Sequence, residues 1–438
     1  MYSLPRTATA PFCPSEVQGS IRIDPAASFF NKLKRFVGPG LLISVGYMDP
    51  GNWATDLEAG AKYGHDLLFV VLLASLAAIL LQSLCVRLGV VAQKDLARAC
   101  HERYGPRVNR FLWLGAEVAI VACDLAEVLG SALALHLLLG VSIPVGIAIT
   151  AFDTLLVLGL QGAGFRRVEA IVLGLVLTIA GCFAVELIMV RPNWFGVMVG
   201  FVPSLERLRE VDALYLAIGI VGATVMPHNL YLHSSIVQTR LVAHTDAGRR
   251  EAIRFGTIDC VLSLALALLV NAAILILAAS AFHETGHSNL VDIEDAYHLL
   301  DPIVGSSVAA LLFGVALLAA GQSSTFTGTI AGQVIMDGFL DLKIPCWQRR
   351  LITRGLALIP AFLGIWWFGP GGVGKMLVLS QVVLSFQLPF AIWPLLRLTS
   401  DPRLMGVFAN GILMKVCAWS VFVVISVANI WLVVSILN

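Results

Sequence analysis

Residues 41–53 read LLISVGYMDPGNW and residues 222–228 read GATVMPH, each within an otherwise apolar stretch. Proline lacks a backbone donor and clashes with the preceding helical turn, so both stretches predict a break in a helix. Such backbone is tolerated at membrane depth only where it lines a cavity or is buried in protein. The breaks carry Asp49, Asn52 and Met226. A buried aspartate is costly unless it is paired or used, which favours a binding site over the alternative of two simple proline kinks.

The composition of the whole chain supports a location in the membrane. Of its 438 residues, 58% are hydrophobic and 13% are charged, and the mean hydropathy is +0.86. Soluble domains are about 45–50% apolar and about 25% charged. So little charge cannot cover a water-exposed surface, which excludes a soluble enzyme. The net charge of +1 lacks the basic field that nucleic-acid binding needs. The chain is predicted to be an all-α membrane protein.

The apolar stretches predict eleven membrane spans, because about 20 apolar residues cross a bilayer as a helix. They lie near residues 37–61, 66–90, 111–139, 142–161, 168–190, 213–237, 255–281, 303–333, 351–369, 375–396 and 412–436. Residues 1–36 are polar and contain no apolar signal-peptide core, so we expect a cytoplasmic tail. Residues 37–438 are predicted to form a single transmembrane domain.

The basic residues predict the orientation. With eleven spans, 24 of the 29 Lys and Arg residues fall on the side of the N-terminal tail and the even-numbered loops. The other five are Lys62, Arg191, Arg207, Arg209 and Lys375. Because basic residues concentrate on the cytoplasmic side, the N-terminus is predicted to be cytoplasmic and the C-terminus periplasmic, in the cell inner membrane.

The two helix breaks fall in the first and sixth spans. Five is an odd number of spans, so the halves 37–190 and 213–396 run in opposite directions through the membrane. This pattern is typical of an inverted-repeat secondary transporter, whose site lies near the midplane between two discontinuous helices. The span at 412–436 is then an eleventh helix outside the repeats.

The polar groups at the breaks indicate a metal site. Asp49 offers a carboxylate oxygen and Asn52 an amide oxygen, and the break before Met226 frees a carbonyl, for which Ala223 is the first choice. Oxygen ligands alone suit Mg²⁺ or Ca²⁺. A thioether from Met226 shifts the preference toward Mn²⁺ or Fe²⁺. A methionine that fills a gap in the core is the alternative for Met226.

Four motifs resemble those of the natural resistance-associated macrophage protein (NRAMP) family. They are DPGN at 49–52, MPHNLYLHS at 226–234, GQSSTFTGTIAGQ at 321–333 and SQVVLSFQLPF at 380–390, and the resemblance covers about residues 37–436. It implies a LeuT-like fold of two inverted five-helix repeats plus an eleventh helix, and proton-linked import of Mn²⁺ or Fe²⁺ into a bacterial cytoplasm.

The resemblance also implies roles for particular residues. The family's metal ligands fall on Asp49, Asn52, the Ala223 carbonyl and Met226, and Gln381 joins them in some conformations. Two positions depart from the family pattern, because Trp53 stands where phenylalanine is usual and Asp56 adds a carboxylate. Neither departure removes a ligand.

A proton route is predicted along the third span. Glu117 and Asp124 are seven residues apart and therefore share a helix face, and Glu127 is one turn beyond Asp124. Carboxylates along a membrane helix are typical of a proton relay. Structural ion pairs with Arg349 and Arg350 are the alternative. In the family, matching carboxylates and arginines serve proton movement.

Three further groups complete the predicted route. His228 and His233 are possible proton acceptors, with an interhelical hydrogen bond as the alternative for His233. Asp49 contributes a proton of its own, because a carboxyl must lose its proton to bind metal.

Other functions fit the sequence less well. Residues 283–287, HETGH, match the HExxH pattern of zinc metalloproteases, but glycine disfavours the helix that the motif needs. A Na⁺- or H⁺-coupled amino-acid transporter of the same fold would place small residues at the breaks, and a passive metal channel would lack proton coupling. The chain has no P-loop, so ATP is not expected to drive it. We expect no cofactor and no obligate protein partner, only metal ions, protons and the lipid bilayer.

Overall fold

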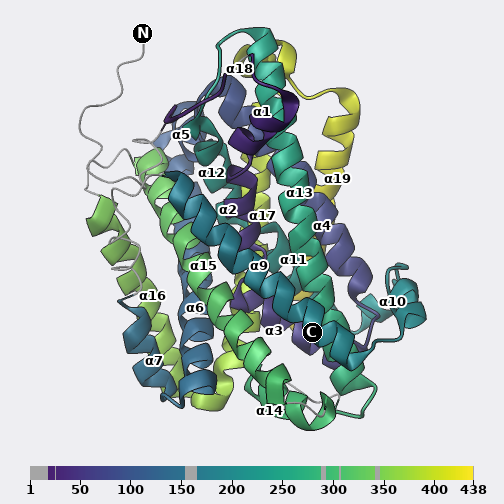
Figure 1. The fold of residues 1–438 in the computed structure, drawn as a ribbon. Helices are drawn as coiled ribbons and strands as arrows, with labels where there is room; N and C mark the ends of the chain where they lie inside the picture. The colour runs from purple at the N-terminus through teal and green to yellow at the C-terminus, as the bar shows by residue number, and fades with distance from the viewer. Residues whose placement is uncertain are drawn as a thin grey trace.

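The computed structural model describes residues 18–24, 26–152, 165–287, 293–304, 307–340 and 346–437, most of them helical (Figure 1). The helices of the first half are α1 (Phe29–Phe36), α2 (Pro39–Gly46), α3 (Pro50–Tyr63), α4 (Leu68–Ala92), α5 (Leu96–Arg103), α6 (Pro106–Leu139), α7 (Ile143–Thr150), α9 (Phe165–Val190) and α10 (Trp194–Gly200). Those of the second half are α11 (Val211–Val225), α12 (Pro227–Ile236), α13 (Asp246–Ala278), α14 (Ile293–Val304), α15 (Ser307–Leu340), α16 (Cys346–Phe368), α17 (Val373–Thr399), α18 (Pro402–Met405) and α19 (Ile412–Leu437).

Each of the eleven predicted spans overlaps described helix, the fourth only in part. Within the described residues, eight helical stretches are long and apolar enough to cross a membrane, and they lie at 68–92, 106–139, 166–190, 211–239, 246–283, 308–340, 373–399 and 412–437. The first span consists of the two short helices α2 and α3, and α16 has an apolar part at Gly355–Phe368. The predicted fourth span begins as α7, and its residues 153–161 lie outside the described part.

Several helices are longer than their apolar stretches. Helix α13 has 33 residues and α6 has 34, so each is about 50 Å long, against about 30 Å for a bilayer core. The additional turns of α13 precede residue 255 and are polar, with Arg249 and Arg250 among them. Hydropathy detects only the part of such a helix that is in contact with hydrocarbon, which is why the predicted spans were too short.

Corresponding spans of the two halves pack against each other. Helix α2 contacts α12 and α3 contacts α11, α4 contacts α13, α6 contacts α15, and α7 contacts α16. These contacts pair the first four spans with spans six to nine, as expected for two repeats around a common axis. In Figure 1, α2 and α12 lie toward the end of the bundle that carries α1, α5 and α18, and α3 and α11 extend toward the other end. The molecule therefore has the LeuT-like inverted-repeat fold.

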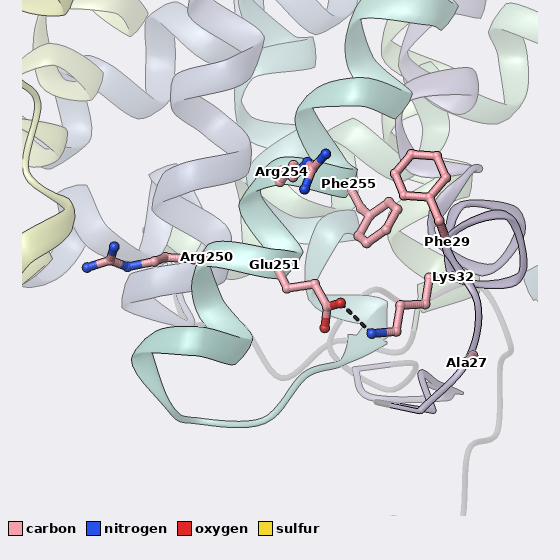
Figure 2. A pocket seen from close by; sticks show the side chains of 7 residues that line it. All are labelled: Ala27, Phe29, Lys32, Arg250, Glu251, Arg254 and Phe255. Carbon is pink, nitrogen blue, oxygen red and sulfur yellow. Dashed lines mark hydrogen bonds and ion pairs between the residues drawn. The ribbon is translucent and has the colours of Figure 1, made fainter.

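Part of the predicted N-terminal tail packs on the bundle. Strand β1 (Ile21–Arg22) pairs in parallel with β2 (Arg240–Leu241) in a two-stranded sheet, and α1 packs on α13. The ring of Phe255 contacts those of Phe29 and Phe36, at centroid distances of 5.2 and 5.3 Å. Figure 2 shows Phe29 facing Phe255 and Lys32 paired with Glu251.

The short helix α2 is held at its N-terminus by α13. The buried Asp259 carboxylate accepts hydrogen bonds from the backbone N–H groups of Gly38 and Gly40, and the contact to Gly40 is 2.7 Å. These donors have no partner within the helix, so the carboxylate satisfies them. Nearby, Arg240 pairs with Glu169 of α9 at 2.8 Å, and both side chains are buried. The half-helix that leads into the first break is therefore anchored to two other spans.

Candidate metal site between the broken helices

Asp49 begins the second half of the first span. Its backbone is extended, and its Oδ1 accepts a hydrogen bond of 2.8 Å from the backbone N–H of Asn52. Pro50 follows at the first helical position, where a missing donor is harmless, so Asp-Pro forms a regular helix start. The other carboxylate oxygen, Oδ2, is buried and receives no hydrogen bond from the described residues. Oδ1 of Asp49 thus stabilises the start of α3, and Oδ2 is left without a hydrogen bond and could bind a metal ion.

The break of the sixth span falls at Met226, between α11 and α12. Met226 has a φ of +40°, a region that L-residues rarely occupy. Pro227 has no backbone N–H, so the carbonyl of Ala223, four residues earlier, has no donor from within the helix. It accepts instead a hydrogen bond of 3.1 Å from Asn52 Nδ2. The Ala223 carbonyl therefore lacks a helical hydrogen bond, as the sequence predicts. It points toward Asn52 at the first break.

The side chain of Asn52 joins the two breaks. Its Nδ2 donates to Asp49 Oδ1 at 2.7 Å, to the Ala223 carbonyl at 3.1 Å and to the Gly46 carbonyl at 3.3 Å. Three oxygens from both broken helices thus surround one buried donor. A bound cation would also need several acceptor oxygens that converge on one point, as these three do.

The orientation of the Asn52 amide differs from the predicted ligand arrangement. Its nitrogen is directed at the other oxygens, and its Oδ1 accepts a hydrogen bond of 3.3 Å from Asn271 Nδ2. A half-turn of the amide would exchange the two atoms and direct Oδ1 at the same centre. Asn271 also donates to the Tyr47 carbonyl at 2.8 Å, so α13 supports the unwound segment from outside.

The thioether of Met226 lies against the same segment. A Cβ on Gly46 would lie 3.2 Å from Met226 Sδ, so the sulfur faces the end of α2. Asn229 Nδ2 lies 3.5 Å from the sulfur and also faces Gly46. Met226 is fully buried.

Gln381 of α17 completes the group. Its side chain occupies the place that a Cβ on Gly51 would take, because that Cβ would lie 1.7 Å from Gln381 Nε2. Its Oε1 is buried and accepts no hydrogen bond from the described residues. All five residues of the predicted metal site thus lie around the two breaks.

Gly222 permits the close approach of α11 to α17. A Cβ on Gly222 would lie 2.0 Å from the Gln381 carbonyl, which is backbone and cannot rotate away. Gly222→Ala is therefore expected to destabilise the protein by about 1–3 kcal/mol, as overpacking does. Thermal unfolding followed by size-exclusion fluorescence measures the effect. Gly174→Ala in α9 is the matched control, because a Cβ there meets nothing within 4 Å, and equal melting of the two variants would contradict the packing described.

Two of the predicted proton-route carboxylates converge on α15. A Cβ on Gly328 would lie 2.6 Å from Glu127 Oε1 and 3.1 Å from Asp124 Oδ1, so both carboxylates of α6 face the same point. Both are buried. Glu117 is seven residues before Asp124, about 10 Å along the helix, and accepts a hydrogen bond of 2.9 Å from Trp113.

A contact chain connects these carboxylates with the sixth span. Cys123 Sγ lies 3.6 Å from Glu127 Oε1 and 3.6 Å from His228 Nε2. One turn after Glu127, a Cβ on Gly130 would lie 2.1 Å from Pro50, so α6 packs directly on the first break. Glu127 and His228 are therefore neighbours of the candidate metal site.

His233 belongs to a different hydrogen-bond chain. Its Nδ1 lies 3.0 Å from Gln82 Oε1, and Gln82 Nε2 donates to the Tyr47 hydroxyl at 2.8 Å. This chain connects α12 with the end of α2 through α4, as the interhelical alternative for His233 predicts. The side chains of Arg349 and Arg350, at the start of α16, lie outside the described part of the structure.

The HETGH stretch does not form a metalloprotease site. The helix ends in a π turn at His283, and the motif continues in a turn. His283 contacts the Ala61 carbonyl and His287 contacts Thr285. In the part of the chain that the structure describes, no three His, Cys, Asp or Glu side chains form a metal-binding group.

Sequence reasoning missed Asn229 and Asn271 as neighbours of the site. Asn229 follows His228 within the same motif, and Asn271 interrupts the apolar stretch LLVNAAIL of α13. An amide in the middle of a membrane span is costly without hydrogen-bond partners. The presence of an asparagine in such a span could therefore have indicated that it lies near the site.

The fold and the site define a class of protein, namely a multi-pass membrane transporter with its site between two discontinuous helices. The model of the family "Natural resistance-associated macrophage protein-like" matches residues 40–435. The divalent metal cation transporter MntH of Ralstonia nicotianae is 65% identical over 98% of each chain.

Solved structures agree with this class. A variant of the Eremococcus coleocola manganese transporter has a TM-score of 0.87 at 37% identity, over 95% of this chain and 89% of that one. The transporter MhsT, solved with L-phenylalanine, has a TM-score of 0.61 over 91% of this chain and 98% of its own, but at 15% identity it supports the fold alone. The chain belongs to the natural resistance-associated macrophage protein (NRAMP) family, as the motifs predicted, and it is a transporter rather than an enzyme.

Proposed function

We propose that this protein imports divalent transition metal ions, Mn²⁺ and Fe²⁺, into the cytoplasm together with protons, by alternating access. The convergence of both helix breaks on one point carries the proposal. There the Asp49 carboxylate and the Ala223 carbonyl both accept hydrogen bonds from the Asn52 amide, and the Met226 thioether faces Gly46 at the end of α2. The relatives in the comparisons are named as divalent metal cation and manganese transporters.

The donor set explains the choice of metal. Carboxylate, carbonyl and amide oxygens bind any hard divalent cation, including Mg²⁺ and Ca²⁺. A thioether adds affinity only for softer ions, so Met226 favours Mn²⁺ and Fe²⁺ over the far more abundant hard cations. The buried position strengthens this preference, because an ion must lose most of its water to enter.

The position of Glu127 supports the proposed proton coupling. Metal binding requires the ionised form of Asp49, so a proton is released when the metal enters. Glu127 and His228 flank the break and are connected through Cys123, and Asp124 lies beside Glu127. A proton leaving Asp49 therefore has buried carboxylates near the break, along α6.

The proposed orientation has the N-terminus in the cytoplasm of a bacterial cell and the C-terminus in the periplasm. It rests on the distribution of 24 of the 29 basic residues to one side of the bilayer.

Met226→Ala tests the choice of metal. The variant is expected to retain part of its Mn²⁺ uptake, and Ca²⁺ is expected to compete about tenfold better than in the parent protein, equivalent to about 1.4 kcal/mol. Mn²⁺ uptake into proteoliposomes with increasing external Ca²⁺ measures this change. Met336→Ala removes another buried methionine, in α15, and should leave competition unchanged. Unchanged competition in Met226→Ala would show that the sulfur does not select the ion.

A further inference from the structure

A basic cavity of about 440 Å³ lies where α5 and α17 end and α18 begins. Among the described residues that line it are three arginines, Arg103, Arg397 and Arg403, and one carboxylate, Asp401. Asp401 lies 3.5 Å from Arg103 and accepts a hydrogen bond from the backbone N–H of Arg403. Three guanidinium groups against one carboxylate leave the cavity with an excess of two positive charges. Figure 1 shows α5 and α18 at the end of the bundle that carries α1.

The wall below the arginines changes from polar to apolar along α17. Trp393 stacks on Tyr104, with a centroid distance of 5.6 Å, and both line the cavity. One turn further into the span, Phe390 packs on Phe111 at 5.2 Å. Phe390, Trp393 and Arg397 are spaced three and four residues apart, so they share one side of α17 over about 10 Å.

This side of α17 faces lipid. Phe390 and Phe111 are 44% and 57% exposed, although both lie on membrane-spanning helices. Exposed phenylalanine at that depth contacts acyl chains, and tryptophan and tyrosine prefer the boundary between hydrocarbon and headgroups. The order of apolar, aromatic and basic residues matches the order of acyl chain, glycerol and phosphate in a phospholipid.

We propose that the cavity binds the headgroup of an anionic phospholipid, with its phosphate between Arg397 and Arg403 and an acyl chain along Phe390 and Phe111. Guanidinium groups hold phosphate oxygens in a bidentate geometry, and basic pockets between membrane helices bind anionic headgroups. Tyr104 also lines the cavity, and its hydroxyl, neutral at physiological pH like that of any tyrosine, can donate a hydrogen bond to the headgroup. The adjoining apolar wall favours a lipid over free phosphate.

The cavity in Figure 2 is also basic but is less suited to an anion. Lys32 pairs with Glu251, the Arg254 guanidinium lies over the Phe29 ring, and that of Arg250 lies over Phe408. In Figure 2 the Arg250 side chain points away from Lys32 and Phe29. The basic groups of the cavity in Figure 2 therefore already interact with other side chains of the protein.

Native mass spectrometry of the purified full-length protein tests the proposal, with phosphatidylglycerol and phosphatidylcholine of equal acyl chains as probes. The parent protein is expected to retain phosphatidylglycerol in preference, and Arg397→Gln with Arg403→Gln is expected to lower that retention about 30-fold, since each of the two basic groups contributes about 1 kcal/mol near an anionic surface. Arg167→Gln, an exposed arginine of α9 outside the cavity, is the matched control and should retain the lipid.

Two further measurements separate the lipid from other causes. Phe390→Gln leaves the charge of the cavity unchanged. It is expected to lower the retention of phosphatidylglycerol as well, because it removes part of the apolar wall. Excess inorganic phosphate should leave the lipid bound. Equal retention by parent and double variant, or displacement by inorganic phosphate, would overturn the assignment. All of these side chains are exposed, and size-exclusion profiles verify that the variants are folded.

Discussion

Asp49→Asn is expected to abolish metal uptake, with a loss of at least about 100-fold. The substitution preserves the shape of the side chain and one oxygen, so the start of α3 can still form. It removes the only full negative charge among the predicted ligands, and a buried dication without a counter-charge is strongly disfavoured. In asparagine, the position of Oδ2 is taken either by an NH2 group or by an uncharged amide oxygen, so the unpaired carboxylate oxygen of Asp49 is lost in both cases. Initial rates of Mn²⁺ uptake into proteoliposomes measure the effect.

Asp212→Asn is the matched control for this substitution. Asp212 is exposed on α11, where it pairs with Lys62 at 2.7 Å, and exposed ion pairs contribute little to stability. The control should transport Mn²⁺ at the parent rate. A folded Asp49→Asn variant with parental uptake would show that the metal binds elsewhere.

Glu127→Gln is expected to separate metal transport from proton transport. Glutamine keeps the volume that faces Gly328 and Cys123 but cannot release a proton. We therefore expect the number of protons that enter per metal ion to fall by about tenfold or more, with part of the metal uptake retained. A pH-sensitive dye inside the vesicles, read together with Mn²⁺ uptake, gives the ratio.

The control for Glu127 should be an equally buried carboxylate outside the route. Glu186 of α9 is 1% exposed, and Glu186→Gln should leave the ratio of protons to metal ions unchanged. If Glu127→Gln acidified the vesicles as the parent does, α6 would not carry the proton, and the carboxylates would be structural.

The sequence was sufficient to predict the breaks because their residues have strong backbone consequences. Asp49-Pro50 forms a helix start wherever it occurs, and Pro227 removes the one donor that the Ala223 carbonyl would use. Both effects are local, so they can be derived without the rest of the structure. Apolar stretches of about 20 residues likewise predicted the spans, because the bilayer sets their length.

Contacts between distant spans could not be derived in this way. Nothing in the sequence around Asn271 indicates that it supports the Tyr47 carbonyl, and the bridge from Glu127 through Cys123 to His228 depends on how α6 and α12 pack. The amide of Asn52 was assigned its oxygen as a ligand, whereas its nitrogen faces the acceptors. The orientation of this amide depends on the hydrogen bond that Asn271, on another span, donates to Asn52 Oδ1.

Glycines that allow close packing also became interpretable only in three dimensions. Gly51 and Gly222 leave room for Gln381, and Gly130 leaves room for Pro50. In the sequence they resemble any other small residue of a membrane helix. Their importance comes from the partner that occupies the space of the missing side chain.

The most direct test is Mn²⁺ uptake into proteoliposomes that contain the purified protein and an internal pH dye, with excess Mg²⁺ outside. The proposed mechanism predicts that Mn²⁺ enters, that the interior acidifies in step with it, and that Mg²⁺ does not diminish either signal. Mn²⁺ entry without acidification would contradict proton coupling and indicate a channel. Absence of Mn²⁺ entry would contradict the metal site itself.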